Sequence, residues 1–187
     1  MPELMADLFL SVDGSAAGSR SPGYFGFDGP ELERWISDEM DRPHRCVMGR
    51  KTYTLLASLP EEARDDGWER MTRTPTVVFS RTLQETSWPG ATINGNDLLD
   101  EIPALKASSD VGLRTVGSLS LVRQLLDAGH LDRLRLMVFP LIIGETGREN
   151  FFTGLGDTAL ELVSQTVLDR RVVLLEYRPA GTPPYAG

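Results

Sequence analysis

The chain has 187 residues, and with 27 acidic against 19 basic side chains its formal net charge is −8 at pH 7. An acidic surface repels polyanions, which disfavours DNA, RNA and anionic membranes as partners. Cys46 is the only cysteine, so an intramolecular disulfide and a thiolate-rich zinc site are excluded. The N-terminus has no basic region, and no apolar stretch has the length of a membrane span, so the sequence predicts a cytoplasmic protein.

Short apolar runs alternate with helical patterns along the first three quarters of the chain. The predicted strands are Leu8–Val12, His44–Met48, Thr76–Ser80, Thr92–Asn94, Leu113–Val116 and Leu134–Pro140. The predicted helices begin at Pro30 with Asp28 as cap, after Gly49, at Leu98, and at Ser118 with Ser118 or Ser120 as cap. Residues 14–29 show no periodicity and predict a functional loop, and the acidic segment before Thr76 predicts an irregular one.

The C-terminal part of the chain has a different pattern. Two runs, Leu160–Leu168 and Arg171–Tyr177, flank a tight turn at Asp169-Arg170 and predict a hairpin. Strand–helix alternation followed by a hairpin predicts an α/β fold with a mixed, mainly parallel sheet and antiparallel edge strands. We expect a single domain over residues 1–178 and a flexible tail over residues 179–187.

Polar or glycine residues follow four of the predicted strands, namely Asp13, Gly49, Ser80 and Gly117. Ligands of open α/β sheets bind beyond the carboxyl ends of the strands, so these four positions are expected to converge on a binding site.

Three of these strand ends carry groups that suit a phosphate. Gly49-Arg50-Lys51-Thr52 combines two cations and a hydroxyl with a helix N-terminus, Ser80-Arg81 adds a guanidinium, and Gly117-Ser118 precedes another helix. Each segment alone is also compatible with an ordinary strand end carrying solvated polar residues. Neither a Walker A loop nor a G-x-G-x-x-G fingerprint is present.

Other chemistries have less support. His44 and Cys46 alternate along one strand while His130 lies in a distant loop, which disfavours a transition-metal site. No G-x-S-x-G nucleophile elbow is present.

Six segments in order carry a resemblance to a known family. They are Leu10–Gly14 (LSVDG), Val47–Tyr53 (VMGRKTY), Val77–Arg81 (VVFSR), Gly117–Leu126 (GSLSLVRQLL), Leu131–Leu136 (LDRLRL) and Pro140–Gly147 (PLIIGETG). Together they resemble the dihydrofolate reductase-like superfamily, and in particular its bacterial branch related to the reductase domain of the riboflavin-biosynthesis deaminase-reductase.

The resemblance implies an eight-stranded sheet, NADPH as cofactor and a homodimer. The implied cofactor-binding residues are Gly49, Arg50, Lys51, Thr52, Ser80, Arg81, Gly117, Ser118, Leu119 and Ser120. Many members have Gly-Gly with a cis peptide where this chain has Gly117-Ser118, and we do not assume that geometry here. The nearly continuous apolar run 134–143 is compatible with a dimer contact or with burial inside one subunit.

Reduction of a C=N or C=O group also requires a proton. Glu31 matches the carboxylate on the first long helix of dihydrofolate reductases, and Asp13 follows the first strand beside the expected nicotinamide position. Asp13 is the stronger catalytic candidate because the sheet fixes its position. An acid in a first helical turn and an aspartate in a turn also occur for structural reasons alone.

The sequence therefore predicts an NADPH-dependent reductase that transfers a hydride to a small heterocyclic substrate, of ribosylamino-pyrimidine or pterin-like kind. The alternative is a dimeric module that binds NADPH without turnover. A second cleft open against the nicotinamide distinguishes the two.

Overall fold

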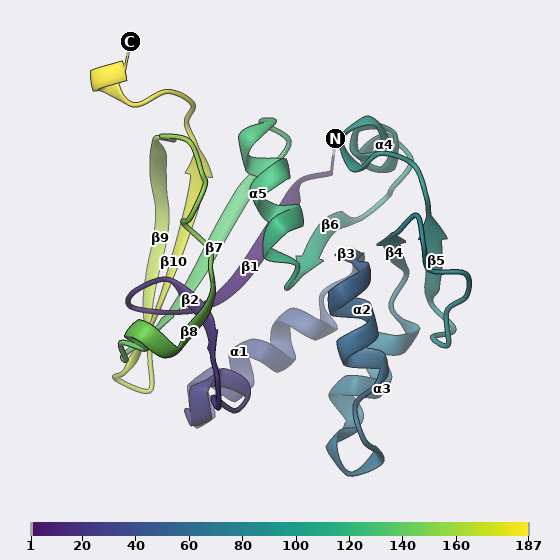
Figure 1. Cartoon of the computed structure of the whole chain (residues 1–187), viewed down its shortest axis with the longest axis horizontal. Helices are drawn as coiled ribbons and strands as arrows, with labels where there is room; N and C mark the ends of the chain where they lie inside the picture. The colour runs from purple at the N-terminus through teal and green to yellow at the C-terminus, as the bar shows by residue number, and fades with distance from the viewer. Residues whose placement is uncertain (1, 187) are drawn as a thin grey trace.

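Figure 1 shows a computed structural model of the chain, which we describe for residues 2–186. The strands are β1 (Leu4–Ser11), β2 (Ser15–Gly18), β3 (His44–Gly49), β4 (Thr76–Phe79), β5 (Ala91–Asn94), β6 (Gly112–Val116), β7 (Arg133–Phe139), β8 (Gly147–Asn150), β9 (Leu160–Leu168) and β10 (Val172–Pro179). The α-helices are α1 (Pro30–Asp41), α2 (Arg50–Ala57), α3 (Asp66–Arg73), α4 (Leu98–Ala107) and α5 (Leu119–Asp127).

Eight strands form one sheet in the order β5-β4-β3-β6-β1-β7-β10-β9. The pairs from β5 to β7 are parallel, whereas β10 runs antiparallel to both β7 and β9. This arrangement confirms the predicted mixed sheet with a C-terminal hairpin. The parallel strands all end at one edge, where the four predicted polar and glycine positions lie.

Helices cover both faces of the sheet (Figure 1). One core lies between α4, α5 and the side chains that alternate along β1, such as Leu8 and Leu10. On the opposite face, Leu32 of α1 packs with Met137 and Phe139 of β7. Tyr53 of α2 packs near β3 and β4 in a third cluster. Because side chains alternate along a strand, Asp7 and Phe9 of β1 point to the opposite face of the sheet, toward α1.

Two predicted segments differ from the structure, one because of a tertiary contact and one because of a local cap. Strand β1 begins at Leu4, four residues before the predicted start. The prediction began after Asp7 because this charged residue interrupts the apolar run. In the structure Asp7 is part of the strand, and its charge is buried in ion pairs with Arg114 and Arg135. The predicted irregular acidic segment contains α3. Asp65 caps this helix by accepting a hydrogen bond from the Trp68 N–H at 2.8 Å, and this is a local signal that the pattern reading missed.

The predicted loop 14–29 contains a strand. Its first residues form β2, which pairs antiparallel with β8 in a separate two-stranded sheet. The sequences of the two strands, SAAG and GREN, have neither alternation nor β-branched residues, so only their pairing identifies them.

The predicted cap of α1 is wrong. Gly29 rather than Asp28 is the N-cap residue, and the carboxylate that satisfies the helix start belongs to Asp169 in the β9–β10 turn. Asp169 accepts hydrogen bonds from the N–H groups of Glu31 at 3.1 Å and Leu32 at 2.9 Å. A Cβ at Gly29 would overlap this carboxylate, which explains the glycine.

The hairpin turn is where the sequence predicts it. Asp169 and Arg170 have φ values of 50° and 57°, the left-handed geometry that suits the twist of a two-residue hairpin. The segment expected to be a tail begins at the end of β10, and Ala180 and Gly181 form backbone hydrogen bonds with Ala159. Gly187 lies outside the described residues. None of the helices in residues 2–186 is long and apolar enough to cross a membrane.

Candidate active site

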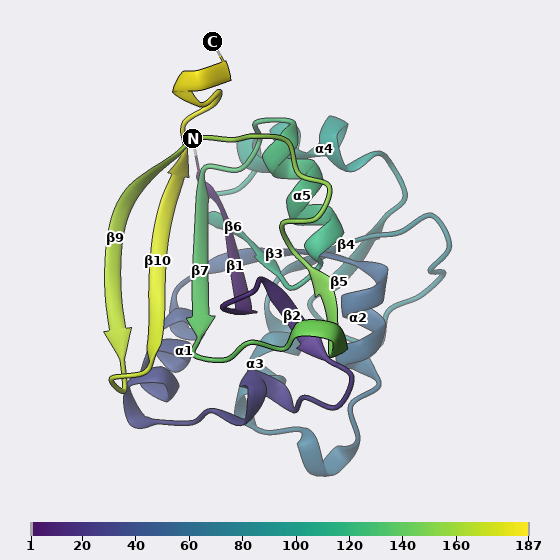
Figure 2. The same ribbon diagram turned by 60° about the vertical axis from the view of Figure 1, so that its left-hand side comes forward.

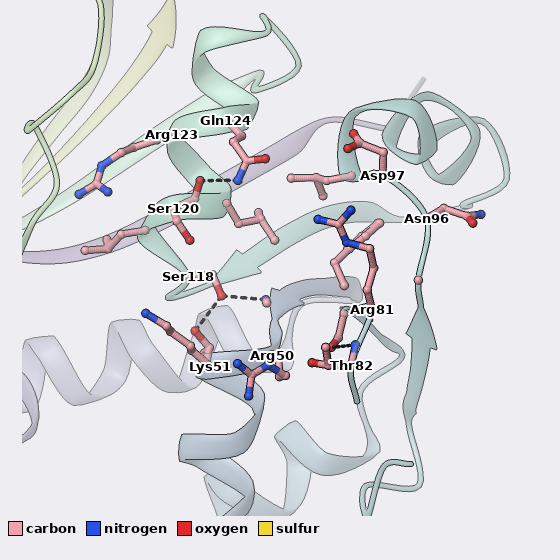
Figure 3. A pocket seen from close by; sticks show the side chains of 18 of the residues that line it. Arg50, Lys51, Arg81, Thr82, Asn96, Asp97, Ser118, Ser120, Arg123 and Gln124 are labelled. Atoms are coloured by element: carbon pink, nitrogen blue, oxygen red, sulfur yellow. Dashed lines mark hydrogen bonds between the residues drawn. The ribbon is translucent and has the colours of Figure 1, made fainter. Parts of the chain in front are cut away.

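A cleft of about 660 Å³ lies at the carboxyl edge of the sheet, where α2, α4 and α5 begin (Figure 3). Nine of the ten residues predicted to bind the cofactor line it: Gly49, Arg50, Lys51, Thr52, Ser80, Arg81, Ser118, Leu119 and Ser120. Converging helix N-termini present backbone N–H groups that favour an anion. The structure therefore brings the three predicted phosphate segments together, and their binding of a cofactor stays a prediction.

The Ser118 hydroxyl joins two of these segments (Figure 3). Its Oγ accepts a hydrogen bond from the Gly49 N–H at 2.8 Å and lies 2.7 Å from Thr52 Oγ1. The sequence predicts Ser118 or Ser120 as the cap of α5; Ser118 is the N-cap residue, but its side chain makes no capping hydrogen bond. The hydroxyl is used instead to fix the start of α2 against the start of α5.

The backbone geometry and close packing at position 117 require a glycine. Its φ is +56°, and a Cβ there would lie 3.3 Å from Thr52 Cγ2. The neighbouring Ser118 also has left-handed backbone angles, with φ and ψ both 55°. The described residues contain no cis peptide bond, so Gly117-Ser118 is trans.

The cleft is basic although the chain is acidic. Four cationic side chains, those of Arg50, Lys51, Arg81 and Arg123, line it together with two carboxylates. Arg123 donates to the carbonyls of Asn150 and Phe151, so it is held against a loop. The other three cations take part in none of the ion pairs found in residues 2–186. They remain available to an anionic ligand.

Ser80, in the second predicted phosphate segment, stabilises a turn. Ser80 Oγ accepts hydrogen bonds from the N–H groups of Thr82 at 3.2 Å and Leu83 at 2.9 Å, which shapes the turn after β4. Arg81 follows in that turn and points toward the cleft (Figure 3). Sequence reasoning missed Asn96 and Asp97, which line the cleft after β5, although they too follow a strand end. Asp97 caps α4 by accepting from the Leu99 N–H at 3.0 Å.

A second pocket, of about 150 Å³, lies between the sheet and helices α1 and α3. It is lined by Asp7, Phe9, Tyr24, Trp35, Ile36, Met40, His44, Cys46, Met71, Thr74, Arg114, Thr115, Val116 and Gly117. Gly117, the tenth predicted residue, lines this pocket, while Ser118 lines the first cleft. Two adjacent residues of one turn thus line the two different cavities. Apart from Gly117, the residues of this pocket were not singled out as ligand-binding residues, because they come from six separate segments.

The two predicted catalytic acids line neither cavity. The Asp13 carboxylate accepts hydrogen bonds from Ser11 Oγ at 2.6 Å and from the N–H groups of Ile143 at 3.1 Å and Gly144 at 2.9 Å. These bonds, with Ser11 first, lower its pKa to about 2. The Glu31 carboxylate accepts from the Asp169 N–H. Both acids thus have structural contacts, and their catalytic role stays a prediction.

The hydrogen bonds of Asp13 predict a pH dependence of stability. Because folding lowers the pKa from 3.8 to about 2, Asp13 contributes stability above pH 4 that is lost as the pH falls toward 2. Asp13→Asn is expected to remove this part of the acid sensitivity, measured as the melting temperature across that range. An Asp38→Asn variant, changed at an exposed acid on α1, serves as the control. If both variants follow the native curve, Asp13 does not carry the effect.

A model of the RibD C-terminal domain family matches residues 2–174. The chain belongs to this family. The match confirms the family resemblance. The uncharacterized protein YyaP of Bacillus subtilis is 25% identical over 179 residues, which cover 93% of each chain.

Solved structures of related proteins have the same fold. A putative riboflavin biosynthesis protein from Shewanella sp. PV-4 matches with a TM-score of 0.71 at 19% identity, covering 95% of this chain and 99% of that one. A pyrimidine reductase-like protein from Corynebacterium diphtheriae matches with a TM-score of 0.66 at 18% identity, over 96% and 92% of the two chains. RibD of Acinetobacter baumannii gives a TM-score of 0.70 at 14% identity, and the match covers 96% of this chain but 58% of RibD.

Proposed function

We propose that this protein is an NADPH-dependent reductase that transfers a hydride to a small heterocyclic substrate with a pyrimidine-like or pterin-like ring. The observation that carries the proposal is the pair of cavities: a basic cleft is lined by Ser118, and a smaller, largely apolar pocket is lined by the adjacent Gly117. A reductase needs two adjoining sites of this kind, one for the cofactor and one for the acceptor. Membership of the RibD C-terminal domain family supports the same reaction class.

The residues of the cleft fit NADPH. Its volume of about 660 Å³ is in the range of cofactor sites, and its free cations suit a ligand with several phosphates. Arg81, at the end of β4, would hold the 2′-phosphate, while Arg50 and Lys51 at the start of α2 would hold the pyrophosphate together with backbone N–H groups. When bound, NADPH supplies the hydride.

The remaining contributions come from the chain itself. A Cβ at Gly117 would lie 3.3 Å from Thr52, a residue that lines the basic cleft, so the glycine keeps this side of the backbone open to a ligand. The apolar walls of the pocket, which include Phe9 and Trp35, exclude water from the acceptor. Asp13 is the proposed organiser of proton delivery, with Glu31 as the second candidate. Unchanged turnover in both Asp13→Asn and Glu31→Gln would remove both acids from the mechanism.

Oxidation of NADPH tests the proposal. The protein is mixed with NADPH and, in separate reactions, with dihydrofolate, pyrimidines, ribosylaminopyrimidine phosphates and simple ketones. Loss of the absorbance of the reduced nicotinamide with at least one heterocycle is the expected result. Saturable NADPH binding without turnover on any acceptor favours the non-catalytic module, and absence of NADPH binding contradicts both.

We also propose that two copies of the chain associate as a homodimer. The apolar run 134–143 does not carry this proposal, because most of it forms β7, which lies inside the sheet between β1 and β10. The support is at β9, the outer strand of the sheet (Figure 2). Its exposed apolar side chains are Leu160, Leu162, Val163 and Val167. An unpaired edge strand with exposed apolar residues suits pairing with a second copy.

Sedimentation tests the dimer. The native protein is expected to sediment as a dimer at micromolar concentration, and the double variant Leu162→Lys/Val167→Lys as a monomer, because lysine on an edge strand opposes pairing. Leu55→Lys, at a position on α2 that is 67% exposed, is the control and is expected to remain dimeric. A native monomer at this concentration contradicts the proposal.

A further inference from the structure

A buried cluster of charged residues, formed by Asp7, Glu39, Arg114 and Arg135, lies beside the pocket next to α1. Arg135 donates to both oxygens of Asp7 and, at 2.6 Å, to Glu39 Oε2. Arg114 donates through Nε to Asp7 and through Nη1 to the Glu39 carbonyl at 2.8 Å. Two of the four, Asp7 and Arg114, line the pocket.

The guanidinium of Arg114 is only partly used by this cluster. Its Nε and Nη1 are engaged, while Nη2 takes part in none of the hydrogen bonds found in residues 2–186. The side chain is 14% exposed and lines the pocket. Asp7 and Glu39 hold the guanidinium in place, so its remaining N–H groups form a preorganised donor for an acceptor atom of a ligand.

The charges that line the pocket nevertheless balance, because the Arg114 guanidinium is paired with the Asp7 carboxylate. Arg42, which pairs with Glu39 at 2.6 Å, has a side chain that is 69% exposed and does not line the pocket. Of the other residues that line the pocket, His44 is the only basic one, and burial lowers its pKa, which favours the neutral ring. The residues that line this pocket offer a phosphate no cation that is free of an ion pair, and a buried charge without a partner is unfavourable. The pocket therefore favours an uncharged ligand.

Size and lining narrow the ligand further. The volume of about 150 Å³ is close to that of cavities that hold one benzene-sized ring, and is half the lower limit of roughly 300 Å³ for most ligand pockets. Phe9, Trp35 and Met71 supply flat or adaptable apolar walls. Tyr24 lies against Phe9 with ring centroids 5.2 Å apart and also lines the pocket.

We propose that this pocket binds an uncharged, planar, single-ring heterocycle whose carbonyl oxygen or ring nitrogen accepts a hydrogen bond from Arg114, and that it rejects the same ring carrying a phosphoribosyl group. The assignment of this ligand as the hydride acceptor rests on the proposed reductase function. The binding preference itself does not, and it is measured without turnover.

Methionine methyl groups report occupancy of the pocket directly. Met40 and Met71 line it, whereas Met137 is buried in the core at 2% exposure. Protein labelled with ¹³C at the methionine methyls is titrated, without cofactor, with uracil and 6-aminouracil, which are uncharged at neutral pH, and with uridine 5′-phosphate. Saturable shifts of Met40 and Met71 with at least one free ring, at least ten times weaker with uridine 5′-phosphate, are expected. Equal or tighter binding of the phosphate, or no saturable shift with any ring, overturns the proposal.

Substitutions test the role of Arg114. Arg114→Lys keeps the charge beside Asp7 but loses the extra donors, and is expected to weaken ring binding at least tenfold. Arg133→Lys is the matched control, because Arg133 is 15% exposed, is paired with Glu3 and Glu176, and lies outside the pocket. Unchanged ring affinity in folded Arg114→Lys overturns the role of Arg114.

Ile36→Trp provides a second variant if Arg114→Lys does not fold. It fills the pocket and leaves the charged cluster intact, so loss of ring binding is expected and retained binding contradicts the assignment of the site. NADPH affinity is measured in the same samples. Ring binding without NADPH binding supports the proposed ligand of the pocket and contradicts the proposed reductase function. NADPH turnover without ring binding supports the reductase function and contradicts the proposed ligand of the pocket.

Discussion

Replacement of Asp7 by asparagine is expected to lower the free energy of unfolding by about 3–5 kcal/mol, the usual cost of removing one partner of a buried ion pair. Asp7 is 6% exposed and contacts both Arg114 and Arg135. The substitution leaves two guanidinium groups in the interior with one carboxylate, that of Glu39. A loss of this size is a large fraction of the roughly 5–15 kcal/mol that stabilises a typical domain.

Chemical denaturation of the native protein and two variants measures this effect. The control is Asp41→Asn, because Asp41 pairs with Arg70 on the surface at 3.3 Å and both side chains are largely exposed. An exposed pair contributes about 1 kcal/mol or less. If Asp7→Asn costs no more than Asp41→Asn, the buried cluster does not stabilise the fold in the way described.

The same cluster predicts acid sensitivity. Burial alone would raise the pKa of Glu39, but the hydrogen bond and charge of Arg135, with Arg114 and Arg42, outweigh it and hold the pKa below its usual value. A lowered pKa means that Glu39 stabilises the fold above the pKa of the unfolded chain and loses this contribution as the pH falls through the lowered value. Glu39 therefore acts in the same direction as Asp13.

Replacement of Arg81 by alanine is expected to reduce the preference for NADPH over NADH by roughly 10- to 100-fold. The reason is the loss of charge-assisted hydrogen bonds to the 2′-phosphate, which contribute about 1.5–3 kcal/mol. NADH lacks this phosphate, so its affinity is expected to change little.

Titration calorimetry with both cofactors gives the two dissociation constants. Arg34→Ala is the control, because Arg34 is an exposed arginine on α1 that lines neither cavity. An unchanged ratio of the two constants in Arg81→Ala contradicts the assignment of this residue to the 2′-phosphate.

The sheet, and the convergence of the three predicted phosphate segments at one edge of it, could be predicted from the sequence because their signals are local. Gly49, Ser80 and Gly117 each follow an apolar run, and the topology of a parallel sheet places such residues at one edge. Predicting the cleft therefore required only this local pattern and no knowledge of contacts between distant residues.

The second pocket could not be predicted in this way. Asp7 and Arg135 are 128 residues apart in the chain, and the register of β1 against β7 sets them side by side. Similarly, Asp169 reaches the start of α1 from the distant hairpin turn. In the sequence each of these residues is one charged side chain among 46, and only the register of the sheet and the packing of α1 show which groups are partners.

A crystal structure of the protein with NADPH tests the central claim most directly. The predicted result is a cofactor in the basic cleft, with its 2′-phosphate against Arg81, its pyrophosphate at the start of α2 or α5, and its nicotinamide at Gly117 facing the small pocket. A cofactor bound elsewhere, or one whose nicotinamide lies away from Gly117, would contradict the account.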